Sequence, residues 1–383
     1  MLRSFVIALV LLGSVSVGVS CFACLWDRDT LAMERQRFPT ALELITGKFL
    51  RHSVDFYLWR VDDRRERIKA EPRPDLYDDL AVAHEKAGDT EEAIRVISAK
   101  AEMYPGLYST HANLGTFYFH SGQFELGLAE IDKALAINPN AHFGREISQK
   151  RLVEYLLRQR REGRSELPLS EETPNGMGPI GFGAFLVGSK TGEAAVENPE
   201  ERIDHGITGV LGMMKFGNHD SPVLLEALGD LLVSRGYDSD AKRLAARAYL
   251  KASYEAKELP AQLAYRDKAK NCLEFQTRGG ASNDTVTLPE LESQFQSELS
   301  EASLWYEKIV SQENGWIADG GNVEQAFESE YYEQPVVGPK LTADGKQPVW
   351  VAVVAASVSL CVALVVIPLV ILRHRKDDAR TAV

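Results

Sequence analysis

The apolar residues in the central part of the chain recur at a fixed spacing of 34 residues. Two stretches, 74–107 and 108–141, align without a gap, and each predicts two amphipathic helices that are joined at a glycine and end at a proline. The matching positions are Leu80 with Leu114, Gly88 with Gly122, Ile97 with Ile131, and Pro105 with Pro139. A unit of this length cannot bury its apolar face alone, so we expect Leu80, Leu114, Ile97 and Ile131 to share one continuous interior.

Small residues occur where the two helices of a pair must approach closely. They are Ala81, Ala93, Gly115, Gly127 and Ala134. Together with the turn glycine and the closing proline, they give a pattern that resembles the tetratricopeptide repeat family over residues 74–141. His84 and Lys100 depart from the family pattern, which has an aromatic and a small residue at these positions. The resemblance implies an all-α solenoid of helical hairpins that binds other proteins and carries out no chemistry.

The segments around the two repeats extend the helical pattern. Residues 142–221 are longer than one period, and their middle part is rich in proline and glycine. We interpret them as a third repeat with a non-helical insert. The predicted units are an N-terminal helical cap at 24–73 (helices 40–51 and 54–69), a third repeat at 142–221 with its insert at 162–200, a further repeat at 222–259, an irregular helical pair at 260–313, and a stalk at 314–348.

Both ends of the chain contain apolar segments. Residues 1–23 predict a signal peptide or an uncleaved anchor, and a lipidated Cys21 or Cys24 is a third alternative. Residues 349–372 carry no charge and are long enough to predict a transmembrane helix, which needs about 20 residues. Basic residues begin the tail, 373–383, so we expect a cytoplasmic C-terminus. The repeats would then lie outside the cytoplasm at a cell membrane, in the periplasm if the organism is bacterial.

The family resemblance also implies a concave groove lined by the first helix of each hairpin. The predicted partner-binding residues are Asp75, Asp78, Val82, Glu85, Lys86, Ser109, Ala112, Thr116, Phe119 and His120, and the repeat at 222–259 would add Val223, Glu226, Asp230, Val233 and Ser234. Asn113 is the one residue that fits a carboxylate clamp, so a free carboxylate is not the expected guest. A mildly acidic groove favours a basic or amphipathic helix. The alternative is a groove filled by the protein's own insert or N-terminal segment.

Composition and charge argue against several other functions. The net charge is −12, and residues 288–335 contain ten Glu and one Asp against one Lys, which disfavours a nucleic-acid partner. No spacing of His, Cys or acidic residues predicts a metal, cofactor or catalytic site. The acidic pair Asp27 and Asp29 has Arg28 between them and is expected to form surface ion pairs. Cys272 has no partner cysteine in the body of the chain, so we expect no disulfide framework.

These observations predict a membrane-anchored, non-enzymatic scaffold for protein–protein interaction in an envelope complex. One alternative is a structural assembly factor that forms homo-oligomers through its own repeats. A minor alternative is a cofactor-dependent enzyme that uses the glycine-rich insert or the Cys21–Cys24 motif. The sequence does not identify the partner, the pathway or the organism.

Overall fold

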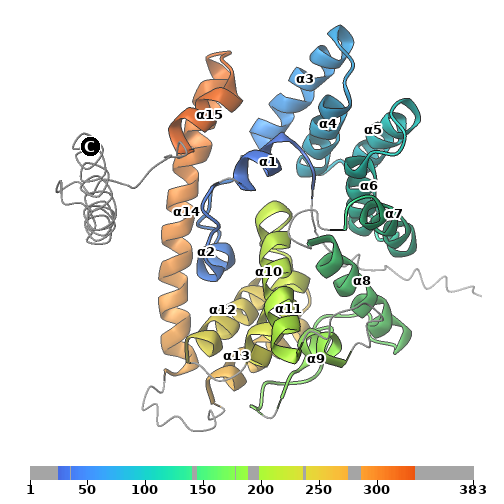
Figure 1. Cartoon of the computed structure of the whole chain (residues 1–383). Coiled ribbons are helices and arrows are strands. Elements are labelled where there is room, and N and C mark those ends of the chain that lie inside the picture. Colours follow the sequence, from blue (N-terminus) through green and yellow to red (C-terminus); the bar gives the residue numbers. More distant parts are fainter. Residues whose placement is uncertain are drawn as a thin grey trace, which may run out of the picture. The chain divides into compact units, whose positions relative to one another are not determined.

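The computed structural model describes residues 25–34, 36–139, 145–176, 178–188, 198–235, 239–274 and 286–332. Within these ranges the regular secondary structure is entirely α-helical, which confirms the predicted all-α class (Figure 1). The first helices are α1 (Arg28–Glu34), α2 (Ala41–Thr46), α3 (Val54–Ala70), α4 (Pro74–Lys86), α5 (Thr90–Met103), α6 (Tyr108–His120), α7 (Phe124–Ile137) and α8 (Arg145–Arg161). They are followed by α9 (Gly181–Gly188), α10 (Pro199–Phe216), α11 (Pro222–Arg235), α12 (Ser239–Glu255), α13 (Leu259–Glu274), α14 (Leu288–Ala318) and α15 (Val323–Tyr331).

The predicted signal segment, transmembrane helix and tail lie outside the described residues. Among the helices that are described, none is both long enough and apolar enough to cross a membrane.

The two stretches with the 34-residue spacing form the helix pairs α4–α5 and α6–α7. Gly88 and Gly122 connect the helices of each pair with φ angles of +91° and +78°, a left-handed conformation that favours glycine. Within the second pair, Gly115 and Gly127 let α6 and α7 approach closely. A Cβ atom on Gly127 would lie 2.3 Å from the Phe119 ring. The small residues therefore set how closely the two helices pack.

Among the described residues the buried apolar side chains form three clusters, so our expectation of one continuous interior is wrong. Leu80 packs with Phe56, Ile97 packs with Leu114, and Ile131 belongs to the largest cluster, around α10 to α12. A buried ion pair explains part of this division. Lys100 replaces the small residue expected on α5, is fully buried, and donates to the carboxylate of Asp78 on α4. Polar groups therefore occupy the junction of α4, α5 and α6.

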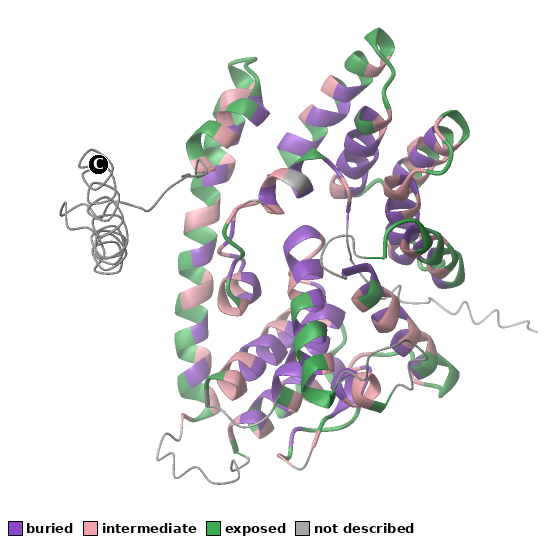
Figure 2. Ribbon diagram, in the orientation of Figure 1, coloured by how far each residue is buried: buried purple, intermediate pink, exposed green. Residues whose placement is uncertain are grey.

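Helices of the insert and of the following repeat pack against one another. Helix α8 packs on α10, and α9 packs on both α10 and α11. Every residue of α11 from Val223 to Val233 is buried, whereas α14 alternates between exposed and buried colouring along its length (Figure 2). Helix α9 lies inside the range 162–200, so the expectation of a wholly non-helical insert is wrong. Its large apolar side chains, Phe182, Phe185, Leu186 and Val187, outweigh the glycines at both ends and at Gly183.

The beginning of the predicted stalk is instead part of the folded body. Helix α14 continues to Ala318, and after a turn at Gly320, with φ +69°, α15 packs back against it. Val323 and Phe327 of α15 are fully buried. The spacing of these two apolar residues is helical, but the glycines before them obscured the pattern. The part of the predicted stalk beyond residue 332 lies outside the described residues.

A pair of glycine substitutions tests the packing of α6 on α7. Gly127→Ala should lower the midpoint of thermal unfolding, because the added methyl group overlaps Phe119 and overpacking costs about 1–3 kcal/mol. Gly315→Ala on α14 is the matched control, since no atom lies within 4 Å of the added Cβ. It should raise the midpoint slightly, because alanine favours the helix over glycine by about 0.5–1 kcal/mol. Equal shifts in the two variants would contradict the close approach.

Candidate functional site

The predicted groove between α4 and α6 is occupied by the N-terminal segment of the chain itself, residues 25–30. The side-chain amide of Asn113 holds the main chain of Trp26 at two points. The Trp26 amide donates to Asn113 Oδ1 (2.8 Å), and Asn113 Nδ2 donates to the Trp26 carbonyl oxygen (3.0 Å). Two residues further on, the Arg28 amide donates to Asp79 Oδ1 (3.0 Å). The groove therefore binds main-chain atoms of Trp26 and Arg28, at and just before the start of α1.

Side chains of the same segment fill the space beside these hydrogen bonds. Leu25 is 2% exposed and joins the apolar cluster of Val82, Ile97 and Leu114. The Trp26 ring meets the Tyr108 ring edge to face, with centroids 5.2 Å apart. The segment thus combines main-chain hydrogen bonds with two apolar contacts, the two components by which grooves usually bind peptides.

Most of the predicted groove residues are covered and have partners within the chain. Asp75 is exposed and pairs with Arg73. The remaining contacts are Asp78 and Ser109 with Lys100, Glu85 with His120, Lys86 with the carbonyl oxygens of Phe216 and Gly217, and Thr116 with Gln149, while Val82, Ala112 and Phe119 are buried among apolar residues. These partners come from helices and connections of the chain itself, and Val82 also shares an apolar cluster with Leu25 of the N-terminal segment.

A second internal segment is held in a similar way by α11. Glu226 accepts hydrogen bonds from the amides of Leu169 (2.9 Å) and Ser170 (3.0 Å), and Asp230 accepts one from the amide of Phe182 (3.0 Å). Both carboxylates are fully buried, and both occupy positions that the sequence assigned to the concave face. The insert therefore occupies this part of the concave face as the N-terminal segment occupies the other.

The glycines of the insert contribute to this packing. A Cβ atom on Gly181 would lie 1.9 Å from Asp230 Oδ2, and one on Gly183 would lie 2.1 Å from Ser234 Oγ. The glycine-rich stretch therefore allows α9 to sit directly on α11. Close packing therefore accounts for Gly181 and Gly183.

The partners of Glu226 and Asp230 complete a buried polar cluster. The hydroxyl of Tyr265 donates to Glu226 (2.7 Å), the hydroxyl of Tyr249 donates to Asp230 (2.7 Å), and Lys268 Nζ lies 3.7 Å from Asp230. Burial raises the pKa of Glu226 to about 7 and also raises the pKa of Asp230, although Lys268 opposes both shifts. The positive charge of Lys268 therefore partly stabilises the ionised form of both buried carboxyl groups.

Charged groups from four elements meet around the buried Arg60 of α3. Its guanidinium contacts Asp27 (3.2 Å), Asp29 (2.6 Å) and Glu324 of α15 (2.8 Å). Arg64, one helical turn further, contacts Asp79 of α4 (2.8 Å) and also Glu324. This ion cluster, formed by Asp27, Asp29, Arg60, Arg64, Asp79 and Glu324, links the N-terminal segment to α3, α4 and α15.

The ion cluster corrects the expectation that Asp27 and Asp29 form surface ion pairs, because both carboxylates are buried. Burial and the neighbouring Asp29 raise the pKa of Asp27 to about 6. Burial also acts to raise the pKa of Asp29, but Arg60 and His52 outweigh it and lower that pKa to about 2. Sequence reasoning missed Arg60 because neighbouring charges on α3 made the helix look solvent-exposed.

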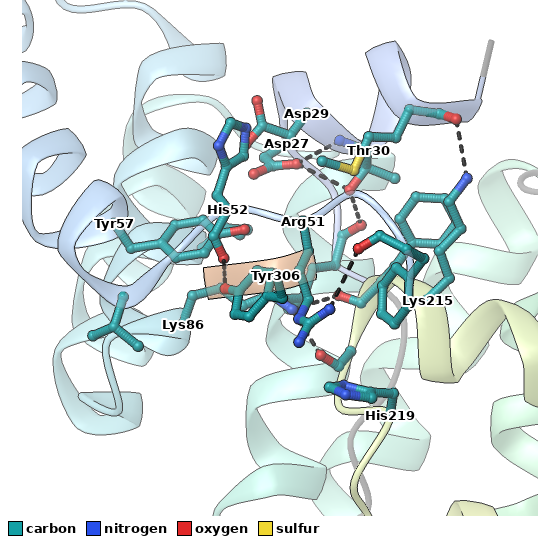
Figure 3. Close-up of a pocket in the computed structure, with 17 residues that line it drawn as sticks. Asp27, Asp29, Thr30, Arg51, His52, Tyr57, Lys86, Lys215, His219 and Tyr306 are labelled. Carbon is teal, nitrogen blue, oxygen red and sulfur yellow. Dashed lines mark hydrogen bonds and ion pairs between the residues drawn. The ribbon is translucent and has the colours of Figure 1, made fainter. Parts of the chain in front are cut away.

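A cavity of about 180 Å³ lies beside the ion cluster (Figure 3). Its walls come from the N-terminal segment, the α2–α3 connection, α4, the end of α10, and α14. The lining residues include Asp27, Arg51, His52, Lys86, Lys215, His219 and Tyr306. The sequence assigned only Lys86 of this set to a binding surface, because the other residues come together only in the folded chain.

The sequence matches no model of a known protein family and no curated protein. Among the residues that the structure describes, no three His, Cys, Asp or Glu side chains are grouped so as to hold a metal ion.

The two hydrogen bonds between Asn113 and the main chain of Trp26 can be tested by removing the side-chain amide of Asn113. In Asn113→Ala, residues 25–30 should lose protection against hydrogen exchange, because Trp26 loses both of its main-chain hydrogen bonds to this side chain. The measurement is hydrogen exchange of the purified full chain, read by mass spectrometry. Asn271→Ala is the control, since this half-buried residue donates to the Asp267 carbonyl oxygen of its own helix, far from residues 25–30 in the sequence. Unchanged protection of residues 25–30 in Asn113→Ala would contradict the assignment.

The raised pKa of Glu226 predicts how stability depends on pH. The folded-state pKa of about 7 lies above the ordinary value of 4.5, so the native state binds the proton more tightly. The tighter binding of this proton adds at most about 3 kcal/mol to the free energy of unfolding. This stabilisation is fully present below about pH 4.5 and is lost as the pH rises through about 7. Thermal unfolding between pH 4.5 and 7.5 should show a shallower decline in Glu226→Gln than in the wild type. Parallel profiles would contradict this role of Glu226.

Proposed function

We propose that this chain is a membrane-anchored scaffold of the tetratricopeptide type, which binds a partner protein through an extended peptide segment. Two features support the repeat assignment: the 34-residue spacing coincides with the helix pairs α4–α5 and α6–α7, and glycines occur at both turns. The uncharged segment 349–372 supports the membrane anchor, with the helical array on the non-cytoplasmic side. No catalytic step is part of this proposal.

The observation that carries the proposal is the double hydrogen bond between Asn113 and the main chain of Trp26. A side chain that forms hydrogen bonds only with the main chain of a bound peptide can bind peptides of different sequence. The neighbouring pockets then give specificity. The pocket beside Val82 holds Leu25, Tyr108 contacts Trp26, and Arg60 pairs with Asp27. We therefore propose a guest with two apolar residues followed by an acidic one, in place of a basic helix.

In this proposal the N-terminal segment competes with the partner for the groove. A tethered segment has a high effective concentration, so a free peptide meets an occupied site. Its apparent affinity falls in proportion to the fraction of molecules in which the groove is open. A partner would bind when its peptide contacts are stronger or when another event releases residues 25–30.

A second candidate is self-assembly through the same groove. Because the groove already accepts Leu25, Trp26 and Asp27, the same residues from a second copy would fit it equally well. Exchange of an identical segment between copies is a low-cost route to a dimer. This candidate predicts a dimer whose formation requires residues 25–30.

A peptide-binding experiment tests the proposed function. A fluorescent peptide with the sequence of residues 25–34 should bind weakly to the purified wild-type chain. In the double variant Leu25→Ser/Trp26→Ala, the tethered segment loses its apolar contacts, so we expect the peptide to bind at least about tenfold more tightly. Fluorescence anisotropy measures the dissociation constant.

Two further variants make this experiment specific. Adding Asn113→Ala to the double variant should abolish the tighter binding, whereas Leu304→Ala, at an exposed position of α14, should not change the wild-type value. The proposal would be overturned if the double variant failed to bind the peptide, or if adding Asn113→Ala left its affinity for the peptide unchanged. Light scattering of the same samples detects a segment-exchanged dimer, which the added peptide should dissociate.

A further inference from the structure

The cavity beside the ion cluster contains more positive charge than its own carboxylates neutralise. Arg51, Lys86 and Lys215 all line it (Figure 3). Lys86 Nζ donates to the carbonyl oxygens of Phe216 and Gly217, both at 2.8 Å, and Lys215 Nζ donates to that of Met33 at 3.1 Å. Arg51 donates to the carbonyl oxygens of Gly47 and Phe49. Within the described part of the chain, none of the three forms an ion pair with a carboxylate.

The acidic groups near the cavity are already matched by other cations. Asp27 and Asp29 both pair with Arg60, and Asp29 also lies 3.4 Å from His52. Asp220, next to His219 in the chain, pairs with Lys251 at 3.0 Å. Acids do lie near the three cations, Asp27 and Glu85 near Lys86, Asp220 near Arg51 and Glu34 near Lys215, but in the described part of the chain none of them forms a direct ion pair with these cations.

Burial makes this imbalance costly. Lys215 is 8% exposed, and burial lowers the pKa of both Lys86 and Lys215 to about 8. Both remain mainly protonated at pH 7, although their surroundings disfavour the charged form. Carbonyl oxygens satisfy hydrogen bonds but supply no counter-charge. Residues that converge on one cavity at such a cost are characteristic of a binding site.

The walls of the cavity are suited to an organic ligand. Phe49, Phe216, Val82, Met33 and Tyr306 provide apolar and aromatic surface next to the cations. The cavity volume of about 180 Å³ is many times the roughly 10–15 Å³ that one water molecule needs. Apolar and aromatic surface combined with convergent polar groups is typical of small-molecule sites.

We propose that this cavity binds a small organic anion, whose carboxylate or phosphate group lies among Arg51, Lys86 and Lys215 and whose apolar body packs on Phe49 and Phe216. The ligand would contact the N-terminal segment, α4 and the end of α10 together. It binds the folded chain only, because these elements are far apart in the sequence. Leu25 and Asp27 line this cavity, so the site is complete only while residues 25–30 occupy the groove between α4 and α6.

The test uses benzoate and phenyl phosphate as probes of the two head groups, with benzyl alcohol as the neutral control. We expect at least one anionic probe to raise the thermal midpoint of the purified full chain at constant ionic strength, because a ligand that binds only the native state stabilises it. Benzyl alcohol at the same concentration should have no such effect. The comparison of the two anions distinguishes a carboxylate site from a phosphate site.

Lysine-to-methionine variants locate the site. Lys86→Met and Lys215→Met should each weaken binding of the effective anion by about tenfold or more, measured by calorimetry, because each removes a charged donor. Both should fold, since each removes a poorly compensated buried charge, and circular dichroism checks this. Lys308→Met, at an exposed position on α14, should bind like the wild type.

Three results would overturn the proposal. The first is that neither anion stabilises the protein. The second is that benzyl alcohol stabilises it as much as the anions do. The third is that folded Lys86→Met and Lys215→Met bind the anion as tightly as the wild type and Lys308→Met.

Discussion

Carboxylates that are buried away from water need hydrogen-bond donors, and in this protein they obtain several of them from the main chain of their own polypeptide. An ionised carboxylate without partners in an apolar interior costs many kcal/mol, so its position is stable only where N–H, O–H or cationic groups converge on it. Asp79, Glu226 and Asp230 meet this requirement by binding the amides of Arg28, Leu169, Ser170 and Phe182. The same hydrogen bonds hold the N-terminal segment and the insert in place.

This constraint connects the two ends of the folded body. Glu324 of α15 is buried and accepts from Arg60 and Arg64 of α3, while Arg60 also holds Asp27 of the N-terminal segment. Glu313 of α14 accepts from the amide of Ser53 at the start of α3 (2.8 Å). Removing one member of such a cluster leaves the others as uncompensated charges, which is strongly destabilising. The groove, the first helices and the last helices therefore depend on one another energetically.

The sequence predicted the local structure better than the long-range contacts. Helical periodicity located α3, α4 and α6 to within a few residues, because spacing, caps and turn glycines are local signals. It also gave the concave positions of Asp78, Glu226 and Asp230. It could not show that Asp27 meets Arg60, or that Glu324 meets both arginines, because a charged residue has the same local pattern on a surface as in a buried cluster.

The remaining errors have similar causes. One interior was expected across the repeats, but Lys100 brings a buried ion pair into the junction of α4, α5 and α6. The start of the predicted stalk is helical because Val323 and Phe327 find an apolar surface that the sequence could not display. The cavity was missed for the same reason, since its cations come from α4, α10 and the connection before α3. Tertiary contacts decided each of these cases.

The central claim is tested most directly by residue-resolved hydrogen exchange of the main-chain amides that donate hydrogen bonds to Asn113 and to the buried carboxylates. The account predicts that the amides of Trp26, Arg28, Leu169, Ser170 and Phe182 exchange at least about a hundredfold more slowly than in an unstructured chain, as expected for hydrogen-bonded groups in a stable core. None of the five lies inside the hydrogen-bonded part of a helix, so helix formation alone would not protect them. Exchange of these amides at the rate of an unstructured chain would show that the grooves are open and would contradict the account.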